Sequence, residues 1–154
     1  QGVGSSHCLP KTAWPPTLEK IIATAPDIIS HNLETVRRMT PLVRSVATYD
    51  RSLEVIRMIH EGGITAKSGI MVGLGETPEE VEETMDDLRS CGCEVLTIGQ
   101  YLQPSRKHFP VAEYVTPEQF ARYQQTGKQK GFSIVESGPL VRSSYHAEKH
   151  IRKG

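Results

Sequence analysis

The chain has 154 residues, the size of one domain or of part of a larger one. Its 18 basic and 18 acidic residues cancel, which excludes a general nucleic-acid binder because such proteins carry a basic surplus. No apolar run approaches the roughly 20 residues that span a bilayer, and three scattered cysteines do not make a secreted disulfide scaffold. We therefore expect a cytoplasmic protein without a membrane partner.

The first part of the chain predicts an irregular leader followed by a helix and a short strand. Residues 1–16 are rich in glycine, serine and proline and have no hydrophobic period. A helix is expected over residues 17–25 and a strand over residues 27–30, where the chain is apolar. A further short helix should follow residue 34 and stop at Pro41, because proline breaks a helix interior.

The rest of the chain predicts three helices that alternate with three strands. Apolar residues three or four apart indicate helices, and Thr77 and Thr116, each followed by proline, have the pattern of a helix start. The predicted helices span residues 50–61, 77–91 and 116–130, and the predicted strands span residues 64–72, 94–102 and 132–136. Such alternation with short connections predicts a parallel sheet with helical crossovers, either open or part of a barrel.

Polar and glycine residues gather where these predicted strands end, which is where parallel α/β proteins bind ligands. Asn32 and Glu34 can hydrogen-bond neighbouring hydroxyls such as those of a ribose, or Asn32 can cap a helix. Gly73 and Gly75 permit close backbone approach to an anion or simply form a turn. Lys67 either binds a carboxylate or lies at an edge or outward position.

Two other groups of residues have both a structural and a functional interpretation. Arg106, Lys107 and His108 form a short basic run that either faces solvent or contacts a ligand. Cys91 and Cys93 flank Gly92 at a predicted helix end, and we expect them to be structural rather than a metal or redox pair.

Four segments taken together resemble lipoyl synthase, a family of radical S-adenosylmethionine (SAM) enzymes. They read HNLET from residue 31, KSGIMVGLGET from residue 67, GQYLQPS from residue 99 and GPLVRSSYHA from residue 138. The last segment is the most specific, whereas the others are partly shared with biotin synthase. The similarity extends over about residues 26–150.

The resemblance implies a fold and a reaction. The fold is the carboxyl-terminal part of a partial (β/α)6 TIM-like barrel over residues 17–147, with residues 1–16 as a leader and residues 148–154 as a basic tail. The reaction is radical insertion of sulfur at carbons 6 and 8 of a protein-bound octanoyl group. The implied cofactors are SAM and two 4Fe-4S clusters, and the implied partners are an octanoylated lipoyl carrier protein or domain and an electron donor such as a flavodoxin or ferredoxin.

The resemblance also implies roles for individual residues. Ser144 matches the serine that ligates an iron of the auxiliary cluster, Ser143 ranks second for that role, and Arg142 matches an arginine near the cluster. Asn32 and Glu34 match positions that bind the ribose of SAM. The other positions that match the cofactor pocket are Lys67, Gly73, Gly75, Glu76 and Gln100.

The chain departs from the family pattern in its cysteines. Each cluster of the family is held by three cysteines, in the spacings Cys-x4-Cys-x5-Cys and Cys-x3-Cys-x2-Cys, and neither triplet occurs here. We therefore expect this chain alone to be inactive. Two alternatives are a non-catalytic fragment that binds a carrier domain, and a cluster-independent α/β enzyme that uses Lys67, Glu76 and His146 for acid–base chemistry.

Overall fold

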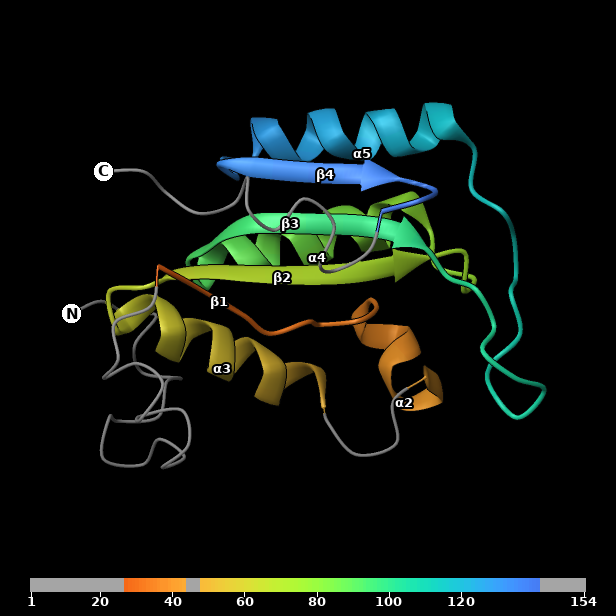
Figure 1. Cartoon of the computed structure of the whole chain (residues 1–154), viewed down its shortest axis with the longest axis horizontal. Helices are drawn as coiled ribbons and strands as arrows, with labels where there is room; N and C mark the ends of the chain where they lie inside the picture. The colour runs from red at the N-terminus through yellow and green to blue at the C-terminus, as the bar shows by residue number, and fades with distance from the viewer. Residues whose placement is uncertain (1–26, 44–47, 142–154) are drawn as a thin grey trace.

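The computed structural model describes residues 27–43 and 48–141, and within these residues four parallel strands form a sheet (Figure 1). The strands are β1 (Ile28–Ser30), β2 (Thr65–Val72), β3 (Cys93–Gln100) and β4 (Ile134–Gly138). They lie in the order β1-β2-β3-β4, so each strand pairs with its neighbours in the chain. The predicted parallel sheet with helical crossovers is confirmed.

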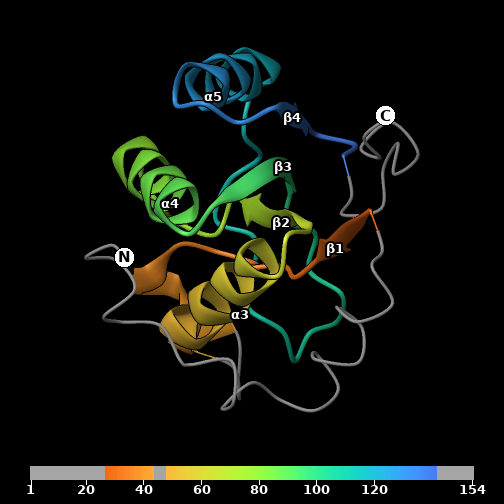
Figure 2. The same ribbon diagram turned by 90° about the vertical axis from the view of Figure 1, so that its left-hand side faces the viewer.

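The helices that connect these strands cover one face of the sheet. They are η3 (Arg37–Met39), α2 (Thr40–Val43), α3 (Tyr49–Glu61), α4 (Pro78–Ser90) and α5 (Pro117–Gln129). Figure 2 shows α3, α4 and α5 on the same side of the sheet. Successive strands with all long helices on one side are the arrangement of a barrel segment rather than of a doubly wound sheet. Within the described ranges, no helix has the length and apolar character needed to cross a membrane.

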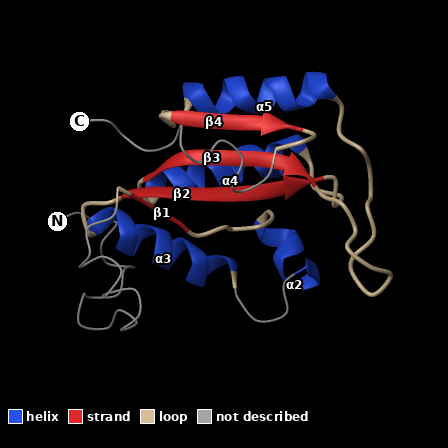
Figure 3. Cartoon of the chain, viewed as in Figure 1, coloured by secondary structure: helices blue, strands red, loops and turns tan. Residues whose placement is uncertain are grey.

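Helices α4 and α5 are drawn in blue in Figure 3, and hydrogen bonds at their starts follow the predicted capping chemistry. The Thr77 hydroxyl accepts a hydrogen bond from the Glu80 N–H at 3.1 Å, and the Glu80 carboxylate accepts one from the Thr77 N–H at 2.9 Å. The Thr116 hydroxyl accepts from the Gln119 N–H at 3.1 Å. These bonds satisfy backbone donors that have no partner in the first helical turn.

Pro41 does not end a helix as predicted but lies near the start of one. It is the second residue of α2, directly after η3. Proline is tolerated in the first turn because the N–H that it lacks would have no helical acceptor there. The sequence-based prediction gave Pro41 the role of a breaker and was wrong.

The last two strands are shifted from their predicted bounds. β3 ends at Gln100 rather than at residue 102, because the chain turns into a long loop. β4 begins at Ile134 rather than at residue 132, because the Phe132 N–H donates to the Gly127 carbonyl at 3.2 Å and so belongs to the end of α5. The predicted helix over residues 17–25 and the predicted leader and tail lie outside the described residues.

The hydrophobic core lies between the sheet and its helices. Each layer supplies fully buried side chains, among them Leu33, Ile56, Leu88, Leu96 and Phe120. Burial of one such side chain contributes about 1.5–3 kcal/mol. The cavity described below lies on the opposite face of the sheet.

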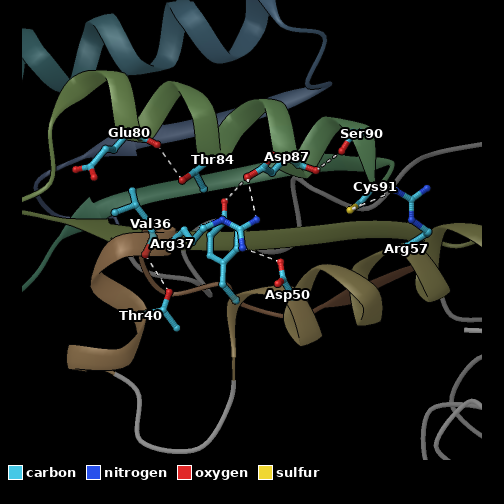
Figure 4. Close-up of polar contacts among 11 residues, drawn as sticks. Val36, Arg37, Thr40, Asp50, Arg57, Glu80, Thr84, Asp87, Ser90 and Cys91 are labelled. Atoms are coloured by element: carbon cyan, nitrogen blue, oxygen red, sulfur yellow. Dashed lines mark hydrogen bonds and ion pairs between the residues drawn. The ribbon is translucent and has the colours of Figure 1, made fainter. Parts of the chain in front are cut away.

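A charged cluster joins η3 to α3 and α4 (Figure 4). The Arg37 guanidinium lies 2.8 Å from an Asp50 oxygen and 4.0 Å from an Asp87 oxygen, and it stacks over the Tyr49 ring with its carbon 4.3 Å from the ring centroid. The Tyr49 hydroxyl donates to Asp87 at 2.8 Å. This cluster holds the segment after β1 against the helices.

Arg38 joins the same segment to the loop after β2. Its guanidinium donates to both Glu80 carboxylate oxygens, at 2.7 and 2.9 Å, and to the Gly75 carbonyl at 2.9 Å. The two-point pairing with Arg38 holds the pKa of the Glu80 carboxyl at about 2, below its ordinary value of 4.5. The contribution of this carboxylate to stability is thus complete above about pH 4.5 and is lost as the pH falls toward 2.

Replacing Arg38 by glutamine should therefore make the protein more sensitive to acid. Without the guanidinium, Glu80 takes up its proton at a higher pH, so the midpoint of acid unfolding should rise within the window from pH 4.5 to 2. Circular dichroism during acid titration measures this midpoint. Arg122→Gln on α5, which removes an exposed arginine bonded to Gln119, is the control and should leave the midpoint unchanged. Equal midpoints in both variants would contradict the prediction.

Candidate cofactor-binding site

The segment after β1 continues along β2 and thereby orients two predicted site residues. The His31 N–H donates to the Lys67 carbonyl, and the Glu34 N–H donates to the Gly69 carbonyl, both at 2.9 Å. Side chains alternate along this extended segment. Leu33 points into the core and is fully buried, while Asn32 and Glu34 line a cavity on the other face of the sheet.

Glu34 adopts a backbone conformation that is costly for a residue with a side chain. Its φ is +78°, in the left-handed region that costs roughly 1–2 kcal/mol for such residues. Its N–H donates to the Gly69 carbonyl, and its carbonyl accepts from the Met71 N–H at 2.9 Å. Both backbone groups of Glu34 are therefore hydrogen-bonded to β2. Retained strain of this kind is concentrated at functional sites.

The cavity lies toward the carboxyl ends of β2 and β3 and has a volume of about 270 Å³. That is near the lower end of small-molecule sites, which span roughly 300–1,000 Å³. Its described lining comprises Asn32, Glu34, Gly69, Ile70, Met71, Thr97, Gly99, Gln100, Leu102 and Val141. Asn32, Glu34 and Gln100, drawn from two separate predicted strand ends, therefore come together in one place.

Gly69 forms a floor between two polar side chains. A Cβ built on Gly69 would lie 2.5 Å from Thr97 Oγ1 and 3.1 Å from Asn32 Oδ1, so only glycine leaves these oxygens room. Asn32 Oδ1 is buried and finds no hydrogen-bond partner among the described residues. A buried acceptor without a donor is costly, and a ligand hydroxyl placed over Gly69 would satisfy it. Asn32, Gly69 and Thr97 together form a cradle with room for a ligand hydroxyl.

The sequence-based predictions did not include Gly69 or Thr97. Both lie inside strands, where glycine and threonine are usually structural, and neither carries a charge that would draw attention. The informative signal is the register, in which Gly69 pairs with Thr97 across β2 and β3. Register is a property of the folded sheet, so the sequence alone does not place these residues beside Asn32.

Gln100 lines the cavity but also anchors a loop. Its amide donates to the carbonyls of Tyr101 at 2.9 Å and Glu113 at 3.0 Å, and its carbonyl accepts from the Val115 N–H at 2.9 Å. Gly73 assists, because its carbonyl accepts from the Ala112 N–H at 2.8 Å. The side chain therefore fixes the loop between β3 and α5 beside the cavity.

The other predicted cofactor-binding residues are not part of the described cavity lining. Gly73, Gly75 and Glu76 form the loop after β2, where the Glu76 carboxylate accepts from the N–H groups of Gly73 and Leu74, both at 2.9 Å. Both oxygens of this carboxylate thus have a structural use in the loop. Lys67 lies deeper on β2 and is buried, which lowers its pKa, while the negative charge of Glu136 opposes that shift.

The described residues do not form an iron–sulfur site. No group of three or more histidine, cysteine or acidic side chains suited to a metal occurs in residues 27–43 and 48–141. Cys91 and Cys93 are buried where β3 begins, at the opposite end of that strand from the cavity, and burial raises the pKa of the Cys93 thiol to about 12. Their expected structural role agrees with this placement. Cys8, Arg142, Ser143 and Ser144 lie outside the described residues, although Arg142 directly follows the cavity residue Val141.

Comparison with known proteins identifies the family. Residues 5–88 match the family model described as the Radical SAM superfamily. The chain belongs to the radical SAM superfamily. It is 72% identical over 135 residues to lipoyl synthase of Bacteroides fragilis, which covers 88% of this chain and 47% of that protein.

Two further lipoyl synthases are also similar to this chain. Identity is 69% over 135 residues with that of Bacteroides thetaiotaomicron, covering 88% of this chain and 48% of the relative. Identity is 65% over 131 residues with the lipoyl synthase of Treponema denticola, covering 85% of this chain and 45% of the relative. The chain spans about half the length of the curated relatives it matches, and the resemblance noted in the sequence is confirmed.

Proposed function

We propose that this chain supplies the SAM-binding, carboxyl-terminal part of a lipoyl synthase. The observation that carries the proposal is 72% identity to lipoyl synthase over 88% of the chain, because superfamily membership alone does not specify a reaction. The whole enzyme would insert sulfur at carbons 6 and 8 of an octanoyl group on a carrier protein or domain. A flavodoxin or ferredoxin would supply electrons.

The cavity residues would bind and orient the nucleoside end of SAM. Asn32 Oδ1 accepts a hydrogen bond from one ribose hydroxyl, and the Glu34 carboxylate accepts from the other. Gly69 leaves space for the sugar, and Thr97 borders it. SAM, when bound, supplies the radical chemistry of the superfamily. The role of this chain in that chemistry is to hold the cofactor at the carboxyl ends of the strands.

Ser144 is the proposed iron ligand of the auxiliary cluster, with Ser143 second and Arg142 beside it. A serine oxygen is a harder ligand than a thiolate and suits a labile iron. Lys67, Gly73, Gly75 and Glu76 are proposed to support the cofactor pocket from around the cavity rather than from its lining.

The test fuses the chain to the amino-terminal half of the Bacteroides fragilis lipoyl synthase, which this chain does not match, and reconstitutes the fusion protein with iron and sulfide under anaerobic conditions. With SAM, a reductant and an octanoylated lipoyl domain, mass spectrometry should detect two added sulfur atoms. Ser144→Ala should abolish sulfur addition while SAM cleavage continues. Sulfur addition by the Ser144→Ala protein would exclude the ligand role, and its absence from the unaltered protein would contradict the proposed function.

A further inference from the structure

The loop of residues 101–116 starts at the cavity and carries at its tip two positive charges that have no ion-pair partner among the described residues. It leaves β3 after Gln100, passes the cavity residue Leu102 and extends beyond the carboxyl ends of the strands before it returns to α5 (Figure 1). Arg106 and Lys107 at its tip are exposed, and neither forms an ion pair within the described residues. Glu113 is the one acidic residue of the loop.

The tip has a defined backbone conformation. The Ser105 carbonyl accepts from the His108 N–H at 3.0 Å, and the Ser105 hydroxyl accepts from the Lys107 N–H at 3.2 Å. The Ser105 hydroxyl also lies 2.8 Å from His108 Nδ1, and the Gln103 amide donates to the His108 carbonyl at 3.0 Å. Because these bonds already order the turn, a partner that binds it loses less conformational entropy.

The two limbs of the loop are tied to the sheet. The Gln100 side chain bonds Glu113 and Val115 on the returning limb, and the Tyr101 hydroxyl donates to the Phe109 carbonyl at 2.6 Å. The position of the tip relative to the cavity is therefore set by the sheet.

The loop also exposes apolar surface. The Tyr114 side chain is 72% exposed, and Leu102, which borders the cavity, is 49% exposed. Tyrosine and arginine are enriched in protein interfaces and provide a large part of their binding energy. We define the loop surface as Leu102, Arg106, Lys107 and Tyr114.

We propose that the loop surface docks an acidic face of the carrier protein that presents the acylated lysine to the cavity. This inference rests on the proposed function, in which the substrate is attached to a folded protein. Such a substrate cannot reach the cavity unless its protein approaches the carboxyl ends of the strands, where the loop extends. Two cations without carboxylate partners favour an acidic surface there, which steers association and sets the orientation of the partner.

The experiment measures binding of a fluorescently labelled, octanoylated lipoyl domain to the full chain by anisotropy, at about 50 and 200 mM salt. The variant Arg106→Glu/Lys107→Glu should weaken binding about tenfold or more at the lower salt concentration, and added salt should no longer weaken its binding. The matched control is Arg122→Glu/Lys128→Glu on α5, which makes the same change in net charge at exposed positions and should alter the affinity less than about twofold. Thermal melts of both variants establish that they fold.

Three results would overturn the proposal. The first is equal weakening of carrier-domain binding by the two double variants, and the second is no binding of the domain to the unaltered chain. The third is unchanged binding of the domain by Arg106→Glu/Lys107→Glu together with slower reduction by flavodoxin, which would assign the loop surface to the electron donor. Failure of the proposed function would give a different result. It would remove sulfur addition in the reconstituted enzyme while leaving the charge-dependent binding of the carrier domain intact.

Discussion

Replacing Asn32 by alanine should weaken SAM binding by at least about tenfold and leave the fold at least as stable as before. The binding loss follows because Asn32 Oδ1 is the buried acceptor proposed for a ribose hydroxyl. Stability should not fall, because a buried acceptor without a partner costs about 1–3 kcal/mol in the free protein and the alanine removes it. Isothermal titration with SAM and urea unfolding measure the two effects.

The neighbouring residue provides the control. Leu33 points to the opposite face and is fully buried in the core, so Leu33→Ala should lower the free energy of unfolding by about 2–5 kcal/mol. The two adjacent substitutions thus separate ligand binding from stability. If Asn32→Ala destabilises the free protein as Leu33→Ala does, Oδ1 has a structural partner and the cradle is not built for a ligand.

Replacing Gly69 by alanine should block the same site by filling it. The new methyl group would lie 2.5 Å from Thr97 Oγ1 and 3.1 Å from Asn32 Oδ1, closer than ordinary contact. Such overpacking costs about 1–3 kcal/mol of stability. We expect SAM binding to become undetectable by titration, since the methyl occupies the space proposed for the sugar.

A second glycine separates crowding from backbone strain. Gly63 has a φ of +82° and open space around its Cβ position, so Gly63→Ala tests strain at a site far from the cavity and should leave SAM affinity unchanged. In the double variant Gly69→Ala/Thr97→Ala the crowding threonine is removed, and part of the lost stability should return. Full SAM affinity in Gly69→Ala would show that the cofactor does not bind over this floor.

Much of the fold is predictable because local chemistry specifies it. Thr77 and Thr116 mark helix starts through side-chain hydrogen bonds to the first turn, and the apolar spacing over residues 50–61 marks α3. Pro41 was misjudged because the same residue ends a helix in its interior and starts one in its first turn. The ends of β3 and β4 depend on pairing partners, which local patterns do not contain.

The site was predictable only in part. Asn32 and Glu34 stand out because polar residues follow an apolar strand, and the structure brings them together with Gln100. The cradle itself depends on Gly69 and Thr97, whose proximity comes from strand register. Glu76 is a residue type that often binds ligands, yet its carboxylate accepts hydrogen bonds from the N–H groups of Gly73 and Leu74 in its own loop. The sequence alone does not reveal this pairing.

The strand order β1-β2-β3-β4 has a consequence for how the chain acquires its structure during synthesis. Within the described residues, each strand after β1 pairs with the one translated before it, so none of these waits for a partner that emerges much later from the ribosome. Paired residues such as Ile28 and Thr65 lie closer in the sequence than β1 and β4 do, so less entropy is lost in closing the intervening segment than in a sheet that pairs its first and last strands. The sheet can therefore grow in the direction of translation, and the anchor of the loop between β3 and α5, Gln100, is in place before the loop that it fixes is made.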